Sequence, residues 1–225
     1  AYCRLDWGGT YQYVVHDSSK YCYAAAFALL ALGSAKRAGV REVRMTSAAR
    51  EAVRWRGDTA PEAPVPVQHL IDEVFTETVS HFFEPQHGNL CIDCFDEQWR
   101  EILPGAAASV GKTTSAVTGG GCGAAGYRGQ NANMHMAEAM LCLHEAAQGD
   151  GCVPAGAEAR ATSYLDLALG ICRRLCHELR PSRAPGAPPG VVDGVWEHFG
   201  SDWKIDWTRN KDAAEDSEEH IFRPW

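Results

Sequence analysis

Apolar residues recur every three to four positions in several long segments of the chain, which is the spacing of one face of an α-helix. The clearest segments are about residues 20–38, 66–83, 131–149 and 163–179. The third ends at Gly149, where a Gly-Asp-Gly sequence is typical of a helix stop. Residues 43–55 are predicted to form another, shorter helix. The pattern therefore predicts a mainly helical protein.

Strand-like patterns are few. The best is residues 87–96, HGNLCIDCFD, which we interpret as a short hairpin that follows a helix. Stretches dense in Pro, Gly and Ala resist regular structure, and we predict loop insertions at 57–66, 104–126 and 181–190. Helix–loop–helix units in this order indicate a helical toroid or a solenoid, and periodicity alone does not choose between them.

The composition is that of a soluble globular protein of 225 residues, with 45% hydrophobic and 22% charged residues. A net charge of −8 gives no electrostatic reason to bind nucleic acid or anionic lipid. No apolar run approaches the roughly 20 residues that span a bilayer. We therefore predict neither nucleic-acid nor membrane partners, and the sequence does not indicate an oligomeric state.

The nine cysteines are scattered and odd in number, and the chain is long enough to fold without disulfides. Cys142, Cys172 and Cys176 fall within apolar helical patterns, where a free thiol packs as a small hydrophobe. We predict a reducing, cytoplasmic location.

Several motif matches carry little chemistry. Residues 121–126 satisfy G-x-G-x-x-G literally, but neither a good strand nor an immediate helix flanks them, so we interpret them as a Gly-rich loop. Four metal-capable side chains follow one another at His81, His87, Cys91 and Cys94. If residues 90–95 are extended, the two cysteines point to opposite faces, so we predict no metal site.

The most informative stretch is 127–138, YRGQNANMHMAE. Asn131 and His135 are four residues apart and share one face of a helix, with Glu138 close to that face. Amide and imidazole groups both donate and accept hydrogen bonds, as a hydroxyl-rich ligand requires. The alternative is a helix N-cap at Asn131 or Asn133 together with a buried, hydrogen-bonded histidine, and spacing alone favours that alternative.

A second cluster, Trp196-Glu197-His198-Phe199, precedes Asp202-Trp203 and Trp207. Aromatic rings among acidic and basic side chains are typical of a sugar site, where rings stack on apolar sugar faces. A loop that packs its tryptophans on the rim of the fold has the same composition, so both interpretations stay open.

Taken in order, these segments resemble the N-acylglucosamine 2-epimerase superfamily, and most of all its aldose–ketose isomerase branch. The matching blocks are Trp7–Tyr11, Ser19-Lys20 with Tyr23 and Phe27–Leu29, His81–Phe83, Phe95–Trp99, Arg128–His135 with Glu138-Ala139, Glu197–Phe199 with Asp202-Trp203, Asn210–Asp212 and Phe222–Trp225. The most specific of them are the RGQNANMH block and the EHF–DW block.

This resemblance implies an all-α fold, an incomplete (α/α)6 barrel or helical toroid with short hairpins and long loops. We expect a single partial domain over residues 1–225, because family members are nearly twice as long. The resemblance places a substrate-facing arginine before this chain and the two proton-transfer histidines outside it.

The implied activity is that of a sugar isomerase or epimerase, which moves a proton at C2 of a monosaccharide through an enediolate, with no metal or organic cofactor. Tyr23, Asn131, His135 and Arg223 match substrate-binding positions of the family, and His135 would support catalysis by binding the sugar oxygens. Glu197 and His198 are assigned to the same site by motif. The alternative is a non-catalytic carbohydrate-binding or interaction remnant of the fold.

Overall fold

The computed structural model describes residues 2–5, 11–14, 19–47, 50, 61–101, 126–148, 157–187, 189–191 and 193–207. Its helices are α1 (Cys22–Arg37), α3 (Val67–His81), α4 (Gln130–Gln148) and α5 (Ala157–Arg173). The four long helical segments predicted from periodicity are confirmed. The last of them begins earlier than predicted, and its end is a π-helical turn at Arg174–Glu178.

The strands are short and pair into antiparallel two-stranded ribbons. The pairs are β1 (Tyr2–Leu5) with β2 (Tyr11–Val14), β3 (Lys20–Tyr21) with β8 (Cys94–Phe95), β4 (Glu42–Val43) with β5 (Val65–Pro66), β6 (Phe83–Glu84) with β7 (Leu90–Cys91), and β9 (Arg128–Gly129) with β10 (His198–Phe199). Short 3-10 helices lie at Pro85–His87 and Pro181–Arg183.

The predicted hairpin needs correction, and the short helix differs at its start. The hairpin predicted within residues 87–96 is formed by β6 and β7 and so begins at Phe83, while β8 pairs with the distant β3. Of the helix predicted over residues 43–55, Val43 lies instead in strand β4, Ser47 and Arg50 are helical, and most of the rest lies outside the described residues. The hairpin error arises because strand pairing is non-local, and a local apolar pattern does not identify the partner strand.

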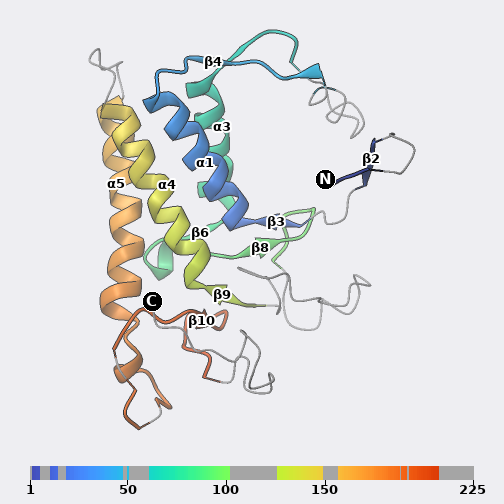
Figure 1. Cartoon of the computed structure of the whole chain (residues 1–225). Coiled ribbons are helices and arrows are strands. Elements are labelled where there is room, and N and C mark those ends of the chain that lie inside the picture. Colours follow the sequence, from blue (N-terminus) through green and yellow to red (C-terminus); the bar gives the residue numbers. More distant parts are fainter. Residues whose placement is uncertain are drawn as a thin grey trace.

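The helices α1 and α4 lie side by side, with α5 packed on α4 and α3 on α1 (Figure 1). Small residues allow the close approach of α1 and α4. A Cβ at Gly33 would lie 3.0 Å from Sγ of Cys142 and 3.2 Å from Cδ2 of Leu143. Spacings of three and four residues put Ala26, Leu29 and Gly33 on one buried stripe of α1.

The described chain contains two copies of one structural unit. In each unit, a strand leads into a helix, and a strand beyond the second helix returns to pair with that first strand, β8 with β3 and β10 with β9. The register repeats, with Lys20 opposite Phe95 in the first unit and Arg128 opposite Phe199 in the second. The backbone also repeats: the first helical N–H donates to the residue before the returning strand, from Cys22 to the Asp93 carbonyl at 2.8 Å and from Gln130 to the Glu197 carbonyl at 2.9 Å.

The same turn closes both units. Trp99 and Trp203 each adopt a left-handed backbone, with φ of 61° and 58°. The backbone N–H of each tryptophan donates to the carbonyl of the residue three positions earlier, Asp96 at 3.1 Å for Trp99 and Gly200 at 2.9 Å for Trp203. A cation from the paired strand lies over each indole, with Nζ of Lys20 4.8 Å and Cζ of Arg128 6.0 Å from the ring centre. Phe-x3-Trp followed by a basic residue is therefore the sequence mark of the repeat.

In the first turn, Asp96 organises the backbone. Its Oδ1 accepts hydrogen bonds from the backbone N–H groups of Arg100 and Gln98, both at 2.9 Å. The Arg100 N–H, followed by the Arg100 side chain and the Gln98 N–H, lowers the pKa of the Asp96 carboxyl below its ordinary value. The carboxylate form therefore stabilises this turn at neutral pH.

Candidate functional site

Three rings from α1 and α4 meet where the first turns of these helices run side by side. The ring centre of His135 lies 5.2 Å from that of Tyr23, edge to face, and 4.7 Å from that of Phe27. Tyr23 and Phe27 are themselves 4.6 Å apart. Both aromatic rings keep more than a third of their surface open, at 37% and 39%. The structure thus joins two of the predicted residues, Tyr23 and His135, and adds Phe27.

His135 is held through one ring nitrogen. Its Nδ1 lies 2.8 Å from Oε2 of Glu138, one helical turn further along α4. The His135 side chain is 19% exposed, whereas that of Glu138 is 55% exposed. Within the described part of the chain, no residue bonds to Nε2. The imidazole is therefore sheltered on one side and available for a ligand hydrogen bond on the other.

The unit repeat explains why these positions coincide. Counted from the paired strand, Tyr23 in α1 corresponds to Asn131 in α4, and Phe27 corresponds to His135. Asn131 is half-buried at the start of α4, one turn before His135. Equivalent positions on two neighbouring helices therefore present a ring pair and an amide–imidazole pair. Arg223, the remaining predicted partner, lies outside the described residues.

The two asparagines of the NAN sequence have different environments. Asn133 is fully buried, its Oδ1 accepts the Cys91 N–H at 2.7 Å, and its Nδ2 donates to the carbonyls of Gly129 at 2.8 Å and Cys91 at 3.3 Å. Because α4 begins at Gln130, neither Asn131 nor Asn133 is its N-cap. Asn133 instead ties β7 of the first unit to α4 of the second.

Glu197 and His198 lie on the ribbon that leads into α4. His198 is opposite Gly129, and its Nδ1 lies 3.0 Å from the Tyr127 hydroxyl. Its Nε2 lies 3.7 Å from a Glu197 oxygen. The two predicted residues therefore contact each other, and Tyr127 joins them. Tyr127 begins the stretch 127–138 but is not one of the predicted site residues.

Gly129 permits this cluster to form. Its N–H donates to Oδ2 of the buried Asp93 at 2.6 Å. A Cβ at Gly129 would lie 2.9 Å from both Oδ1 of Asp93 and the Tyr127 hydroxyl. Tyr21 occupies the corresponding position of the first unit, so the close approach of a carboxylate and a phenol is particular to the second.

Behind the ribbon, Arg128 joins the two units. It is 2% exposed and lies 3.2 Å from Glu84 and 2.7 Å from Glu101. Burial alone would lower the pKa of its guanidinium, but hydrogen bonds and charge from Glu101 and Glu84 raise it. Glu84 also accepts the indole N–H of Trp203 at 2.8 Å. This network fixes the floor beneath the ribbon, with Nε of Arg128 bound to Glu84 and Nη1 bound to Glu101 and to the Tyr127 carbonyl.

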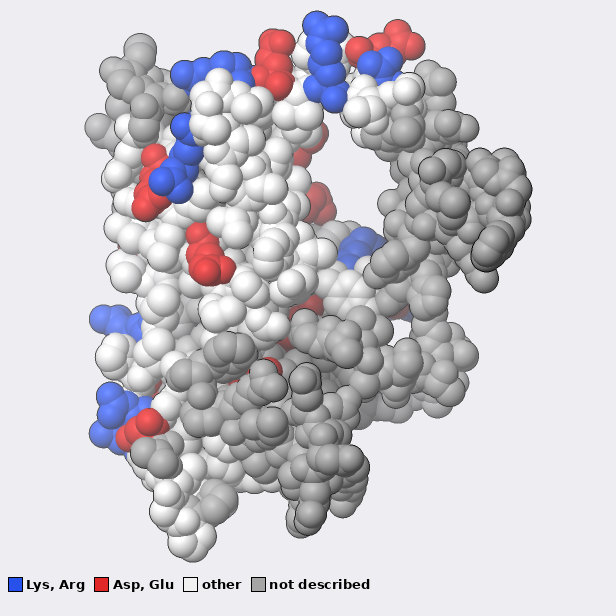
Figure 2. Space-filling model, in the orientation of Figure 1, with Lys and Arg blue, Asp and Glu red and all other residues white. Residues whose placement is uncertain are grey.

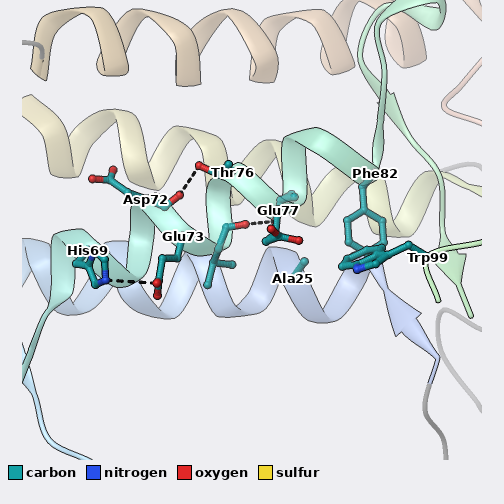
Figure 3. Close-up of a pocket in the computed structure, with 10 residues that line it drawn as sticks. Ala25, His69, Asp72, Glu73, Thr76, Glu77, Phe82 and Trp99 are labelled. Carbon is teal, nitrogen blue, oxygen red and sulfur yellow. Dashed lines mark hydrogen bonds and ion pairs between the residues drawn. The ribbon is translucent and has the colours of Figure 1, made fainter. Parts of the chain in front are cut away.

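A separate groove of about 740 Å³ lies between α1 and α3 (Figure 3). Trp99 and Phe82 lie at one end and His69 at the other. Its polar groups are largely satisfied by neighbours: His69 pairs with Glu73 at 3.3 Å, and the Thr76 hydroxyl donates to the Asp72 carbonyl at 2.7 Å. None of the predicted site residues lines this groove.

In Figure 2, charged side chains are sparse over α1 and α4, and basic and acidic side chains both gather beyond the end of α1. Lys36 and Arg37 lie in the last turn of α1, and Arg37 pairs with Glu145 of α4 at 2.9 Å. Among the described residues, no helix is long and apolar enough to cross a membrane.

The cysteines do not form a metal centre among the described residues, where no group of three or more metal-type ligands converges. Cys91 is a buried free thiol, and its hydrogen bond with Cys22, followed by burial, raises the Cys22 pKa. Cys94 is an exception to the expected free thiols, because it is disulfide-bonded. His81, another of the four metal-capable side chains, stacks on Trp99, with the ring centres 3.8 Å apart.

Comparison with known proteins shows what this chain is similar to. A sequence model of the N-acylglucosamine 2-epimerase (GlcNAc 2-epimerase) family matches residues 7–225, which include both units. The chain is also similar to a D-mannose isomerase from Marinomonas mediterranea, with 27% identity over 209 residues. That alignment covers 93% of the chain but 35% of the relative, so the chain spans well under half of the relative's length.

Proposed function

The chain belongs to the N-acylglucosamine 2-epimerase family, and on that premise we propose that it forms part of a sugar isomerase or epimerase. The substrate is a monosaccharide, and the reaction moves a proton at C2 through an enediolate. The similarity to a D-mannose isomerase favours a hexose. The two stacked units are proposed to be part of an (α/α)6 toroid, in which α1 and α4 belong to the inner ring.

The observation that carries the proposal is the placement of His135 against two exposed rings. A hexose has apolar C–H faces and an equatorial belt of hydroxyls, so it needs both aromatic surface and hydrogen-bonding groups. Tyr23 and Phe27 supply the aromatic surface. His135 and, one turn earlier, Asn131 supply polar groups that can form hydrogen bonds with the hydroxyls.

In this proposal His135 binds and orients the sugar rather than acting as the principal base. Proton transfer at C2 requires a base whose pKa is close to the working pH, and a histidine suits it. The enediolate oxygens require fixed donors as charge develops. Glu197 and His198, at the same end of α4 as Asn131, are proposed to line this site with Arg223.

Exchange of the C2 hydrogen with solvent tests the proposal. The protein that carries residues 1–225 together with the proton-transfer histidines expected outside them is incubated in D2O with mannose, fructose or N-acetylmannosamine. Deuterium at C2 of the aldose, or at C1 of fructose, is followed by NMR. We expect exchange that falls at least about 10-fold in His135→Ala, a loss typical of a positioned side chain. His144→Ala is the matched control, because His144 lies two turns along α4 with a hydrogen bond to Gln148 at 3.0 Å.

Sugar binding without deuterium incorporation would instead identify the non-catalytic alternative. Equal exchange rates in the wild type, His135→Ala and His144→Ala would contradict the site assignment, because the loss of a side chain that contacts the reacting sugar should change the rate. Slower exchange in Tyr23→Ala than in the wild type would independently support a place for α1 in the site.

A further inference from the structure

We propose that Glu138 is a positioning residue that holds the imidazole of His135 in the tautomer with the proton on Nδ1. Nε2 is then the hydrogen-bond acceptor that His135 offers to a sugar hydroxyl. The tautomer follows from the geometry of α4 alone, and its use toward a sugar rests on the proposed function.

The first step is the hydrogen bond between the two side chains. Nδ1 of His135 and Oε2 of Glu138 are 2.8 Å apart, within the range of a charge-assisted bond. An ionised carboxylate has no proton to donate, so Nδ1 must carry it. In a neutral imidazole the second nitrogen is then an acceptor.

The second step is the fixed orientation of the ring. Tyr23 meets the imidazole at an interplanar angle of 80° and Phe27 at 54°. These contacts come from α1, whereas the hydrogen bond comes from α4 itself. With one nitrogen bound and two rings against it, the imidazole has little freedom to rotate and exchange the positions of its nitrogens.

The third step is the chemical consequence for a bound sugar. A neutral His135 in this tautomer accepts a hydrogen bond from a sugar hydroxyl at Nε2 and does not donate to a carbonyl oxygen. If it gains a proton, Glu138 faces the resulting imidazolium directly. This pairing of a carboxylate with Nδ1 is the general way in which proteins select the tautomer of a functional histidine.

A purely structural role does not account for Glu138. Its side chain is 55% exposed, and an exposed ion pair adds little to stability. Glu145 offers a matched comparison on the same helix. Its side chain is also 55% exposed, but its carboxylate pairs with Arg37 at 2.9 Å instead of with a histidine.

The test is histidine-selective 15N NMR of the full chain, which distinguishes the two tautomers by their nitrogen shifts. We expect the His135 signals to show a proton on Nδ1 in the wild type and in Glu145→Gln. In Glu138→Gln the amide can donate or accept, so we expect the tautomer preference to be lost. A wild-type proton on Nε2, or the same tautomer in Glu138→Gln as in the wild type, would overturn the proposal.

The sugar arm of the test uses the C2 exchange described above. We expect Glu138→Gln to slow exchange by about 10-fold or more, a loss common for residues that orient a functional histidine, with Glu145→Gln unchanged. A lost tautomer preference with undiminished exchange would support the positioning role and refute its use toward the sugar, whereas no exchange in the wild type would count against the proposed function. The two failures are therefore distinguishable.

Discussion

The replacement of Asn133 by alanine should unfold this protein more readily than any exposed substitution on the same helix. Asn133 is 0% exposed, and its carboxamide bonds to both backbone groups of Cys91 and to the Gly129 carbonyl. Alanine supplies none of these bonds. The three buried backbone groups would be left in a site that water does not reach.

The magnitude follows from the three distances. The bonds of 2.7 Å and 2.8 Å are of good length, and the one of 3.3 Å is weaker. A buried polar group left without a partner costs about 1–3 kcal/mol. Two strong bonds and one weak bond, with partial relaxation, give a loss of about 3–5 kcal/mol. Since a domain is stabilised by about 5–15 kcal/mol, this is a large fraction of the total.

The assay is urea denaturation followed by far-UV circular dichroism. Asn131→Ala is the control, because Asn131 lies two residues earlier on α4 and is only half-buried, and its loss should cost about 0.5 kcal/mol or less. Asn133→Asp keeps the acceptor for the Cys91 N–H but places an oxygen against two carbonyls, so it should be no more stable than Asn133→Ala. Equal midpoints for Asn131→Ala and Asn133→Ala would refute the reasoning.

Two further substitutions test the junction between the units. Gly129→Ala would place a methyl group 2.9 Å from the Asp93 carboxylate and should lower the free energy of unfolding by about 1–3 kcal/mol. Gly200→Ala is the control, because the nearest contact of its methyl group is 3.4 Å, and it should change the free energy little. Equal thermal midpoints for the two variants would contradict this. Arg128→Met leaves two carboxylates without their buried cation and should cost about 3–5 kcal/mol in urea denaturation. Arg100→Met removes the ion pair with Asp96, in which 74% of the arginine side chain is exposed, and should cost about 1 kcal/mol or less. A comparable loss of stability in both arginine variants would show that burial of Arg128 is not the cause of its larger effect.

The sequence predicted only part of the arrangement of the candidate site. The spacing of Asn131 and His135 correctly put both on α4, because helical periodicity is a local property. The same spacing could not separate Asn131 from Asn133. That distinction depends on β7, which is some 40 residues away and whose backbone needs a partner.

The internal repeat is also present in the sequence, as Phe-x3-Trp followed by a basic residue at Phe95 and at Phe199, but helical periodicity does not reveal it. Between residues 95–101 and 199–205 the two copies share a phenylalanine, a tryptophan and a basic residue, and the segments that join the two helices of each unit differ in length. In both copies the tryptophan has a left-handed backbone, and a cation lies over its ring. Such features have a clear meaning only when the strand pairing is known.

The amino-acid sequence by itself determined where the helices are, because each turn of an amphipathic helix is written within a few neighbouring residues. Tertiary structure decided which side chains meet. Phe27 joins Tyr23 and His135 because α1 and α4 pack closely at Gly33, and Gly129 admits Asp93 because the two units dock there. Contacts between segments a hundred residues apart depend on the docking of whole helices, which no local pattern contains.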